Sequence, residues 1–382
     1  MAHIQDRGKD VERRWQARYR DPDGRERTRS FRRKADAQRW IDEKTADMLT
    51  GRYVDPSSGR ITFREHAERW RASQPHRPST ASLYERLLRL HVYPTLGDRR
   101  LSSVKRSDIQ GWIAKLSDEL APASVDGCYS RVRTIFRAAV DDRLIAETPC
   151  RNIALPEIVE EKIVPLTTEQ VKTLASAAPA DLEAMVVFGA GTGLRSGEIL
   201  GLAVEAVDFL RREVHVEQQL VYISGTGVFL APPKTKAGVR TVPVPSHALE
   251  ALSEHLRRFP PTEIRVPWGD PDGGEVSARL VFLSTKGKPI LRTTLNGRWT
   301  RMARRVGVPS TPHDLRHHYA SILIDGGESV KVVQERLGHA SATETLDTYS
   351  HLWPSSDERT RTVVERAWDA APAKHARGEQ SS

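Results

Sequence analysis

Cysteine is almost absent from this sequence, which has only Cys128 and Cys150 among its 382 residues. Two cysteines in so long a chain exclude the disulfide framework of small secreted domains, and we expect both to be packing residues in a reducing, cytoplasmic setting. The sequence also lacks any run of about 18 apolar residues, so we expect no membrane-spanning helix. The first residues contain no apolar segment of the signal-peptide kind.

Acidic residues are fewer than basic ones: 50 Asp and Glu stand against 59 Lys and Arg, a formal net charge of +9. This balance favours a polyanionic partner, because cationic side chains release the counterions condensed on phosphates. Hydrophobic residues make up 38% of the chain, which is enough for modest cores. The length suits two or three domains.

Residues 1–58 have the pattern of a small sheet followed by a helix. Apolar and polar side chains alternate from Trp15 to Tyr19, as in a half-buried strand, and Asp21-Pro22-Asp23-Gly24 is a strong turn sequence. Residues 25–31 are the expected returning strand, and residues 34–49 the expected helix. Arginines crowd the strands, among them Arg18, Arg20, Arg27 and Arg29. Such a surface is either solvated or laid on DNA.

Residues 60–155 are predicted to be helical, with helices over 79–93, 107–116 and 122–140. The apolar face of the first of these is assigned to Leu83, Leu87, Leu88 and Leu90. The last has its own apolar stripe. Arg131 and Arg133 lie off that stripe, and we take them as candidate DNA contacts.

Residues 164–370 have a mixed pattern. Thr167 and Gln170 form a capping box at a helix start. Two strands are expected over 214–222 and 229–244, and helices follow. Residues 371–382 are predicted to be a disordered tail.

Six residues of this last part have the chemistry of one reaction centre: Arg195, Lys234, His313, Arg316, His339 and Tyr349. Breaking a phosphodiester requires an in-line nucleophile, stabilisation of the extra negative charge, and a proton for the leaving oxygen. Two-metal nucleases use bound cations for much of this work. A tyrosine oxygen near arginines, a lysine and histidines suits the same task without a metal.

The motifs around these residues span 192–198, 233–236, 313–318 and 337–339, and Tyr349 follows closely behind. In this order they resemble the tyrosine recombinases of the phage-integrase type, and the resemblance extends to about residue 365. It implies a multidomain, mainly α protein with small β-sheets. We expect an N-terminal arm-type DNA-binding domain with a three-stranded sheet plus a helix at 1–58, a helical SAM-like core-binding domain at 60–155, and a mixed α/β catalytic domain at 164–370. β-Ribbons are a known means of DNA docking, so in this family we favour DNA contact for the arginine-rich strands.

The resemblance implies a site-specific recombinase that cuts and rejoins DNA through a 3′-phosphotyrosyl bond, without metal, ATP or another cofactor. Its partners would be double-stranded attachment-site DNA, further copies of the chain in a synaptic homotetramer, and a host DNA-bending factor and a directionality factor. The arm-like N-terminal module favours integration and excision of a phage or other mobile element.

The resemblance and the residue chemistry assign roles within the centre. Arg195 and Arg316 form a clamp, because a guanidinium stays charged and can hold two phosphate oxygens, and Glu198 supports Arg195. The polar neighbours of Tyr349, such as Thr348, favour a partly wet site.

Two histidines and a lysine complete the assignment. His313 lies near a helix N-terminus, which favours the neutral imidazole, so it either accepts the proton of Tyr349 or hydrogen-bonds the phosphate. His339 hydrogen-bonds a non-bridging oxygen. By resemblance Lys234 protonates the leaving 5′-oxygen, with Lys236 as the alternative.

Competing interpretations remain open on the residues alone. A telomere resolvase or a plasmid-dimer resolvase would share the chemistry, and three others differ from it. His313-Asp314-x-x-His317 resembles a zinc-binding helix, but Asp replaces the expected Glu and Arg316 would crowd a cation. A type IB topoisomerase shares the constellation but needs no arm-type module. A non-catalytic site-specific DNA-binding regulator would lack one of the six groups, and none is missing.

Overall fold

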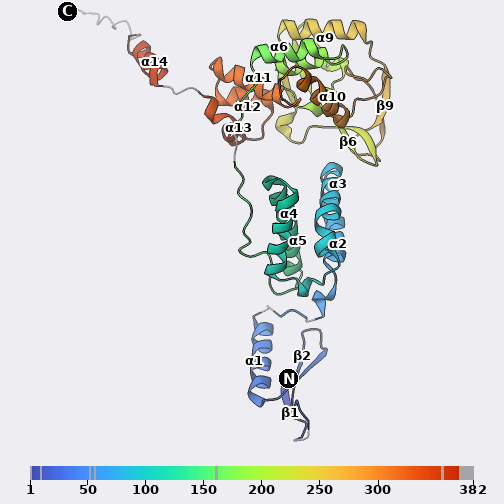
Figure 1. The fold of residues 1–382 in the computed structure, drawn as a ribbon, viewed down its shortest axis with the longest axis vertical. Coiled ribbons are helices and arrows are strands. Elements are labelled where there is room, and N and C mark those ends of the chain that lie inside the picture. Colours follow the sequence, from blue (N-terminus) through green and yellow to red (C-terminus); the bar gives the residue numbers. More distant parts are fainter. Residues whose placement is uncertain are drawn as a thin grey trace, which may run out of the picture. The chain divides into compact units, whose positions relative to one another are not determined.

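The structure is a computed structural model that describes residues 2–8, 11–50, 53–55, 57–159, 162–353 and 357–369. The chain divides into two compact units, Met1–Glu160 and Glu161–Ser382. The predicted fold, mainly helical with small sheets, is confirmed (Figure 1). The predicted tail over 371–382 lies outside the described residues. No helix in the described ranges is long and apolar enough to cross a membrane.

The first unit begins with an antiparallel three-stranded sheet, as predicted. Its strands are β1 (His3–Asp6), β2 (Trp15–Arg20) and β3 (Glu26–Phe31), in that order, followed by helix α1 (Lys34–Leu49). The alternation in β2 points Ala17 toward α1, where it is buried with Ala37 and Ile41. The period-two pattern and the helix bounds are therefore confirmed.

The rest of this unit is helical. Its elements are η1 (Ser58–Arg60), α2 (Phe63–Ser73), α3 (Pro78–Leu87), η2 (Leu88–Gly97), η3 (Leu101–Ser103), α4 (Arg106–Glu119) and α5 (Pro122–Asp141). Phe63, Trp112 and Phe136 are buried at the centre of their core. Cys128 and Cys150 are free thiols buried in the same core, which confirms their packing role.

The apolar face predicted for residues 79–93 is half confirmed: Leu88 is buried and Leu87 packs against the same core. Leu83 and Leu90, however, are 44% and 49% exposed. At Leu88 the helix changes to wider π-type turns, so Leu90 leaves the spacing of three and four on which the prediction depended. Helix α3 instead packs through Tyr84, whose ring lies 5.8 Å from that of Trp70.

The second unit opens with helices α6 (Thr168–Ala177), α7 (Glu183–Thr192) and α8 (Ser196–Leu200). The capping box is confirmed: the backbone N–H of Gln170 donates to Thr167 Oγ1 at 3.2 Å, and that of Thr167 donates to Gln170 Oε1 at 2.8 Å. Helix α7 is buried along most of its length and packs against α6, α9 and α11. Its C-terminus therefore fixes the residues that follow, including Arg195.

Three small sheets come next. They contain β4 (Val207–Asp208), β5 (Glu213–Val216) and β8 (Arg240–Pro243); β6 (Gln219–Ile223) and β7 (Gly227–Ala231); and β9 (Glu263–Pro267) and β10 (Glu275–Arg279), with single turns η4 (Val204–Ala206) and η5 (Lys236–Gly238). The two long strands predicted over 214–222 and 229–244 are thus each interrupted. Pro232 and Pro233 have no N–H to donate to a ladder, so the second strand cannot continue through them.

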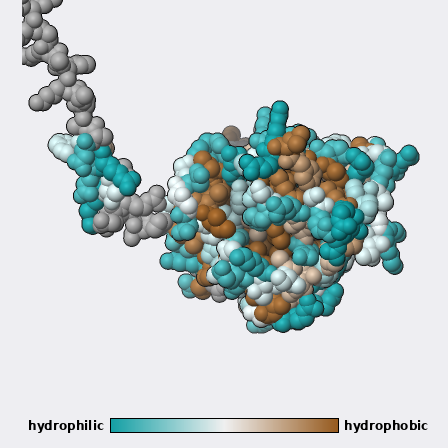
Figure 2. Space-filling view, turned by 90° about the horizontal axis from the view of Figure 1, so that it is seen from above, coloured by the Kyte–Doolittle hydropathy of each residue, from teal (hydrophilic) through white to brown (hydrophobic). Residues whose placement is uncertain are grey.

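Helices complete the unit: α9 (Ser246–Arg258), α10 (Arg292–Arg305), α11 (Asp314–Asp325), α12 (Val330–Leu337), α13 (Ala342–Tyr349), the turn η6 (Ser350–Leu352) and α14 (Asp357–Asp369). Helix α12 packs against both α11 and α13. On the face of this unit shown in Figure 2, apolar residues form separate patches between hydrophilic side chains.

Candidate active site

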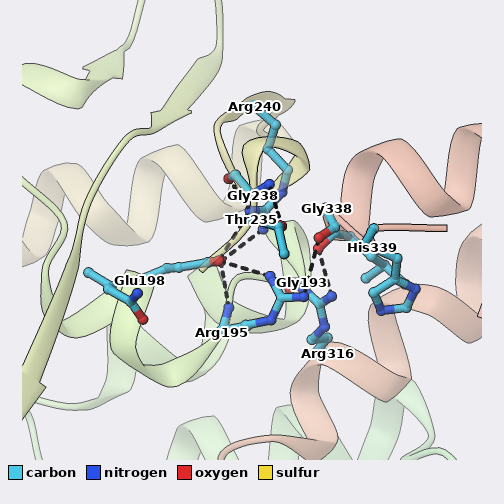
Figure 3. A network of polar contacts seen from close by, with 12 residues as sticks. Gly193, Arg195, Glu198, Thr235, Gly238, Arg240, Arg316, Gly338 and His339 are labelled. Carbon is cyan, nitrogen blue, oxygen red and sulfur yellow. Dashed lines mark hydrogen bonds and ion pairs between the residues drawn. The ribbon is translucent and has the colours of Figure 1, made fainter. Parts of the chain in front are cut away.

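A buried carboxylate, Glu198, holds two arginines at the start of α8 (Figure 3). Arg195 is the N-cap of this helix; its backbone N–H donates to Glu198 Oε2 at 2.9 Å and its Nη1 donates to Oε1 at 3.1 Å. Burial alone would raise the pKa of Glu198, but the hydrogen bond and charge of Arg240, together with Arg195, hold that pKa below its usual value. Glu198 therefore stays ionised and supports Arg195.

Arg240 is the second partner of Glu198, and the sequence interpretation missed it. Its Nη2 donates to Glu198 Oε2 at 2.9 Å, its Nε donates to the Arg336 carbonyl at 2.8 Å, and its Nη1 donates to the Gly238 carbonyl at 2.9 Å. The side chain is only 6% exposed. The sequence contains one indication of this role. Arg240 lies two residues before the buried Val242 on the same strand, so both side chains point to the same face of the sheet. An arginine on a buried face needs a carboxylate partner.

Arg316, on α11, is 2% exposed and bonds only to backbone carbonyls within the described residues. Nη1 donates to Gly193 at 2.8 Å and Nη2 donates to Leu337 at 2.6 Å. Burial, and then the nearby charge of Arg195, lower the pKa of Arg316 to about 9, so it remains a cation at neutral pH.

Two glycines present carbonyls to these arginines. Gly193 has φ +63° and lies so close to Tyr319 that a Cβ would meet its ring at 2.4 Å. Gly338, which ends α12, has φ +65°, and its carbonyl accepts a bond from Arg195 Nη2 at 3.3 Å. A side chain at either position would be strained, so the turns that hold the arginines require glycine.

His339 follows directly and is 5% exposed. Its Nδ1 shares a hydrogen bond of 2.8 Å with Thr345 Oγ1, and its ring is stacked on that of Tyr349 with centroids 6.3 Å apart. Burial, and then the charges of Arg316 and Arg195, lower the pKa of His339 to about 3. At neutral pH it is therefore an uncharged hydrogen-bonding group.

Tyr349 ends α13, the helix that Ser341 caps: the N–H of Glu344 donates to Ser341 Oγ at 3.3 Å. The expectation of a partly wet tyrosine is wrong, since Tyr349 is 1% exposed. Its polar sequence neighbours point elsewhere; Thr348, for example, donates to the Glu344 carbonyl. Burial raises the pKa of Tyr349 to about 12, and the charges of Arg316 and Arg195 oppose that rise.

The hydrogen-bond partner of the Tyr349 hydroxyl is His317, with Nδ1 and Oη 2.9 Å apart. His313, the predicted neighbour, is the N-cap of α11 and has an exposed side chain. Its ring lies 4.8 Å from that of His317, perpendicular to it. Desolvation of the part of the ring that faces the protein, and then the nearby His317 and Arg316, lower the pKa of His313 to about 4. The role given to His313 stays a prediction.

Lys234 and Lys236 lie on the connection between β7 and β8, and both are exposed. Lys236 begins η5, whose turn is capped by Thr235 Oγ1 accepting from the N–H of Gly238 at 3.2 Å. Within the described residues neither lysine side chain forms an ion pair or a hydrogen bond.

The candidate DNA-contact arginines fall into different environments. The register pairs Ala17 with Arg29 and Tyr19 with Arg27, which puts Arg27 and Arg29 on the α1 side of the sheet and Arg18 and Arg20 on the open face. Arg27 pairs with Asp21 at 2.9 Å and also with Asp55, whereas Arg20 is exposed. In the helical part, Arg131 lies over the Tyr84 ring at 5.1 Å and Arg133 is exposed.

The zinc interpretation gains no support from the histidine pair, because His317 Nδ1 is engaged with Tyr349. Across the part of the chain that the structure describes, no group of three or more His, Cys, Asp or Glu side chains is arranged to hold a metal ion.

Comparisons with known proteins agree along nearly the whole chain. Residues 12–50 match the phage integrase N-terminal domain, residues 63–155 match the phage integrase central domain, and residues 165–355 match the phage integrase family. The chain is 30% identical over 305 residues to the XerC-like tyrosine recombinase of Caldanaerobacter subterraneus subsp. tengcongensis, which covers 75% of this chain and 77% of the relative.

Solved structures agree as well. The Tn1549 transposon integrase in complex with transposon right end DNA is 26% identical, with a TM-score of 0.68 over 80% of this chain and 99% of that chain. The lambda integrase tetramer bound to a Holliday junction, at 19% identity, shares the fold, with a TM-score of 0.55 over 89% of this chain and 96% of that one. This chain belongs to the phage integrase family. It has a tyrosine recombinase catalytic domain and is an integrase-type site-specific recombinase that binds DNA.

Proposed function

We propose that Tyr349 attacks a scissile DNA phosphate, forms a 3′-phosphotyrosyl bond and releases a 5′-hydroxyl. The observation that carries this is the enclosure of the Tyr349 ring by His339 and His317, with the charges of Arg316 and Arg195 acting on its hydroxyl. A desolvated hydroxyl beside fixed cations is a poor nucleophile until a phosphate arrives and a base removes its proton. The site therefore suits attack only on a bound anion.

The arginines divide the work of holding that anion. The Arg195 side chain is 36% exposed and its bond to Gly338 is long, at 3.3 Å, so its outer nitrogen is the donor we assign to a non-bridging oxygen. Arg316 donates to two backbone carbonyls, and we assign it a contribution to the positive potential at the phosphate through its charge. Loss of one preorganised donor of this kind costs roughly 100- to 1000-fold in rate. His339 contributes a neutral hydrogen bond.

The leaving 5′-oxygen needs a proton, and we assign that proton to Lys234. An exposed lysine without an ion pair in the described residues can move toward DNA without breaking one. Lys236 is the alternative, although it is part of the capped turn η5.

The 5′-hydroxyl of a partner duplex then attacks the phosphotyrosyl ester. The bond energy is retained in that ester, so neither ATP nor a metal is needed. We propose that four copies of the chain exchange strands in pairs on two attachment sites, with a host DNA-bending factor and a directionality factor as accessory proteins. Support comes from the shared fold with the lambda integrase tetramer on a Holliday junction.

We assign arm-site binding to residues 1–58, core-site binding to 60–155 and catalysis to 164–370. The three family matches fall within these ranges. The type IB topoisomerase alternative would need no arm-type module, whereas residues 12–50 match the phage integrase N-terminal domain.

Covalent trapping tests the proposal. Purified protein is mixed, in EDTA, with nicked suicide duplexes cut from the DNA that flanks its own gene, beside Tyr349→Phe. A protease-sensitive shifted band on a denaturing gel with wild type alone is the expected result. An adduct with Tyr349→Phe would remove Tyr349 from its role. Tight binding by both proteins with no adduct would favour the non-catalytic regulator.

A further inference from the structure

The cleavage reaction must take a proton from Tyr349, and one side chain already shares that hydrogen. His317 Nδ1 lies 2.9 Å from Tyr349 Oη, and the two rings meet edge to face with centroids 5.6 Å apart. The contact joins α11 to α13, and the two residues are 32 positions apart in sequence. It is also the position that a proton acceptor must occupy, within hydrogen-bond reach of the atom that loses the proton.

The charge state of His317 suits this task. Burial lowers its pKa, Arg316 acts in the same direction and Asp314 opposes them, so the imidazole is neutral at neutral pH. In the tautomer with hydrogen on Nε2, the Nδ1 lone pair faces the phenol and accepts its hydrogen.

The other two histidines are less well placed. His339 Nδ1 bonds to Thr345, and the His339 ring is stacked on the Tyr349 ring and does not bond to the Tyr349 hydroxyl. His313 is exposed and touches His317 through a perpendicular ring contact at 4.8 Å, while the hydroxyl bonds to His317.

The carboxylate of Asp314 would stabilise the imidazolium that forms when His317 takes the proton of Tyr349. Asp314 starts α11, where its Oδ2 accepts from the backbone N–H of Thr311 at 2.6 Å and from Thr311 Oγ1 at 2.9 Å. Its charge favours the protonated forms of both His313 and His317. The proton can therefore reside on His317 during the life of the covalent intermediate.

We propose that His317 is a further catalytic residue, the base that accepts the Tyr349 proton. As the Tyr349 oxygen bonds to phosphorus, its O–H bond breaks and the proton moves to His317 Nδ1; the bond from phosphorus to the 5′-oxygen breaks, and that oxygen takes a proton from the general acid. On rejoining, the incoming 5′-hydroxyl restores the general acid and His317 returns its proton to the departing tyrosine. This inference rests on the proposed function and names the base within it.

Chemical rescue tests the step. In full-length protein on the suicide duplex, His317→Ala is expected to slow adduct formation by roughly 100- to 10,000-fold, the usual contribution of a general base. Replacing Tyr349 by 3,5-difluorotyrosine, whose phenol ionises more readily, should recover at least about tenfold of that loss, because a more acidic hydroxyl gives up its proton with less help from a base. In the wild-type background the same replacement should give little gain.

Two variants keep the test independent of folding. His317→Asn can still hydrogen-bond the hydroxyl but cannot carry its proton, so it should bind DNA normally, cleave slowly and be rescued in the same way. His313→Ala is the matched control, one helical turn away, and should show no rescue by the fluorinated tyrosine.

The possible outcomes separate the two proposals. Adduct formation by His317→Ala or His317→Asn at the wild-type rate would overturn the inference, as would a loss that the fluorinated tyrosine leaves unchanged. Rescue of His313→Ala instead would assign the base to His313. Absence of an adduct with wild-type protein on a duplex that it binds would count against the proposed function itself.

Discussion

Two groups of cations in the catalytic unit differ in how they are held. Arg195, Arg240 and Arg316 are bonded to a buried carboxylate or to backbone carbonyls, and Arg240 and Arg316 are almost fully enclosed. Lys234 and Lys236 are exposed and, in the described residues, unpaired. Donors that stabilise a transition state work best when they need no rearrangement. A proton donor for the leaving group is needed only when DNA is present.

The difference implies a division of labour. The arginine network carries the permanent structure of the site, and its charges have partners within the protein. The connection that carries the lysines begins with Pro232 and Pro233. Arg240 anchors its far end, because Arg240 Nη1 donates both to the Gly238 carbonyl and to Glu198 Oε1. Breaking each group separately should therefore give different kinds of defect.

The largest effect is expected at the unpaired lysine. Lys234→Ala should slow cleavage by roughly 100- to 10,000-fold, because the 5′-oxygen would leave without a proton. A 5′-thio leaving group needs no proton and should restore the rate. Adduct yields on oxygen and sulfur substrates measure this, with Lys236→Ala as the matched control. If sulfur rescued only Lys236→Ala, the two lysines would exchange roles.

Breaking the arginine network should cost stability as well as rate. Arg240→Ala leaves Glu198 buried with one partner fewer and is expected to destabilise the protein by about 3–5 kcal/mol. Arg279→Ala breaks an ion pair to Glu205 in which both side chains are 54% exposed, and should cost under about 1 kcal/mol. Denaturant unfolding of both variants measures the two losses in stability. Equal losses would mean that the Glu198 network is not a structural support.

Acid should weaken the site through its neutral histidines. The pKa of His339 is about 3 in the folded protein and about 6.5 in an unfolded chain. Below pH 6.5 the unfolded state therefore binds more protons, and stability falls as pH falls toward 3. Between about pH 7.5 and pH 5, the unfolding free energy of His339→Gln should therefore fall by about 2 kcal/mol less than that of the wild-type protein. Parallel losses in urea titrations would contradict this assignment.

The smallest effect concerns the N-terminal sheet, where the same contrast recurs. Arg20 is exposed on the open face, whereas Arg27 is tied to Asp21 and Asp55. The logarithm of the arm-site binding constant falls linearly with the logarithm of the salt concentration. Arg20→Ala should make this slope less steep by about 0.9, the contribution of one phosphate contact. Arg27→Ala should leave the slope unchanged. A larger change with Arg27→Ala would show that its ion pairs open on DNA.

Much of the fold could be predicted because its signals are local. The helix over 34–49 and the Thr167 capping box depend on a few neighbouring residues, and the structure confirms them. The strands around Lys234 were predicted too long, since strand ends depend on partners far away in sequence.

The parts of the site that escaped prediction depend on tertiary packing. The burial of Tyr349 follows from its packing against α11 and α12, which its polar neighbours Thr348 and Ser350 do not indicate. His317 stands next to Arg316 in sequence, but only the path of α13 brings the tyrosine to it. Arg240 belongs to the site because Glu198 is buried between it and Arg195, a contact between distant parts of the sequence.

We expect the arginine pocket to be assembled before DNA binds and the lysine connection to become ordered only on DNA. Hydrogen exchange on the free protein tests this most directly. The amides of Arg195 and His339, bonded to Glu198 and to the Gln334 carbonyl, should be protected, and those of Lys234 and Thr235 should exchange rapidly. Attachment-site DNA should slow exchange mainly at Lys234 and Thr235. Rapid exchange at Arg195 and His339 that only DNA suppresses would contradict the account.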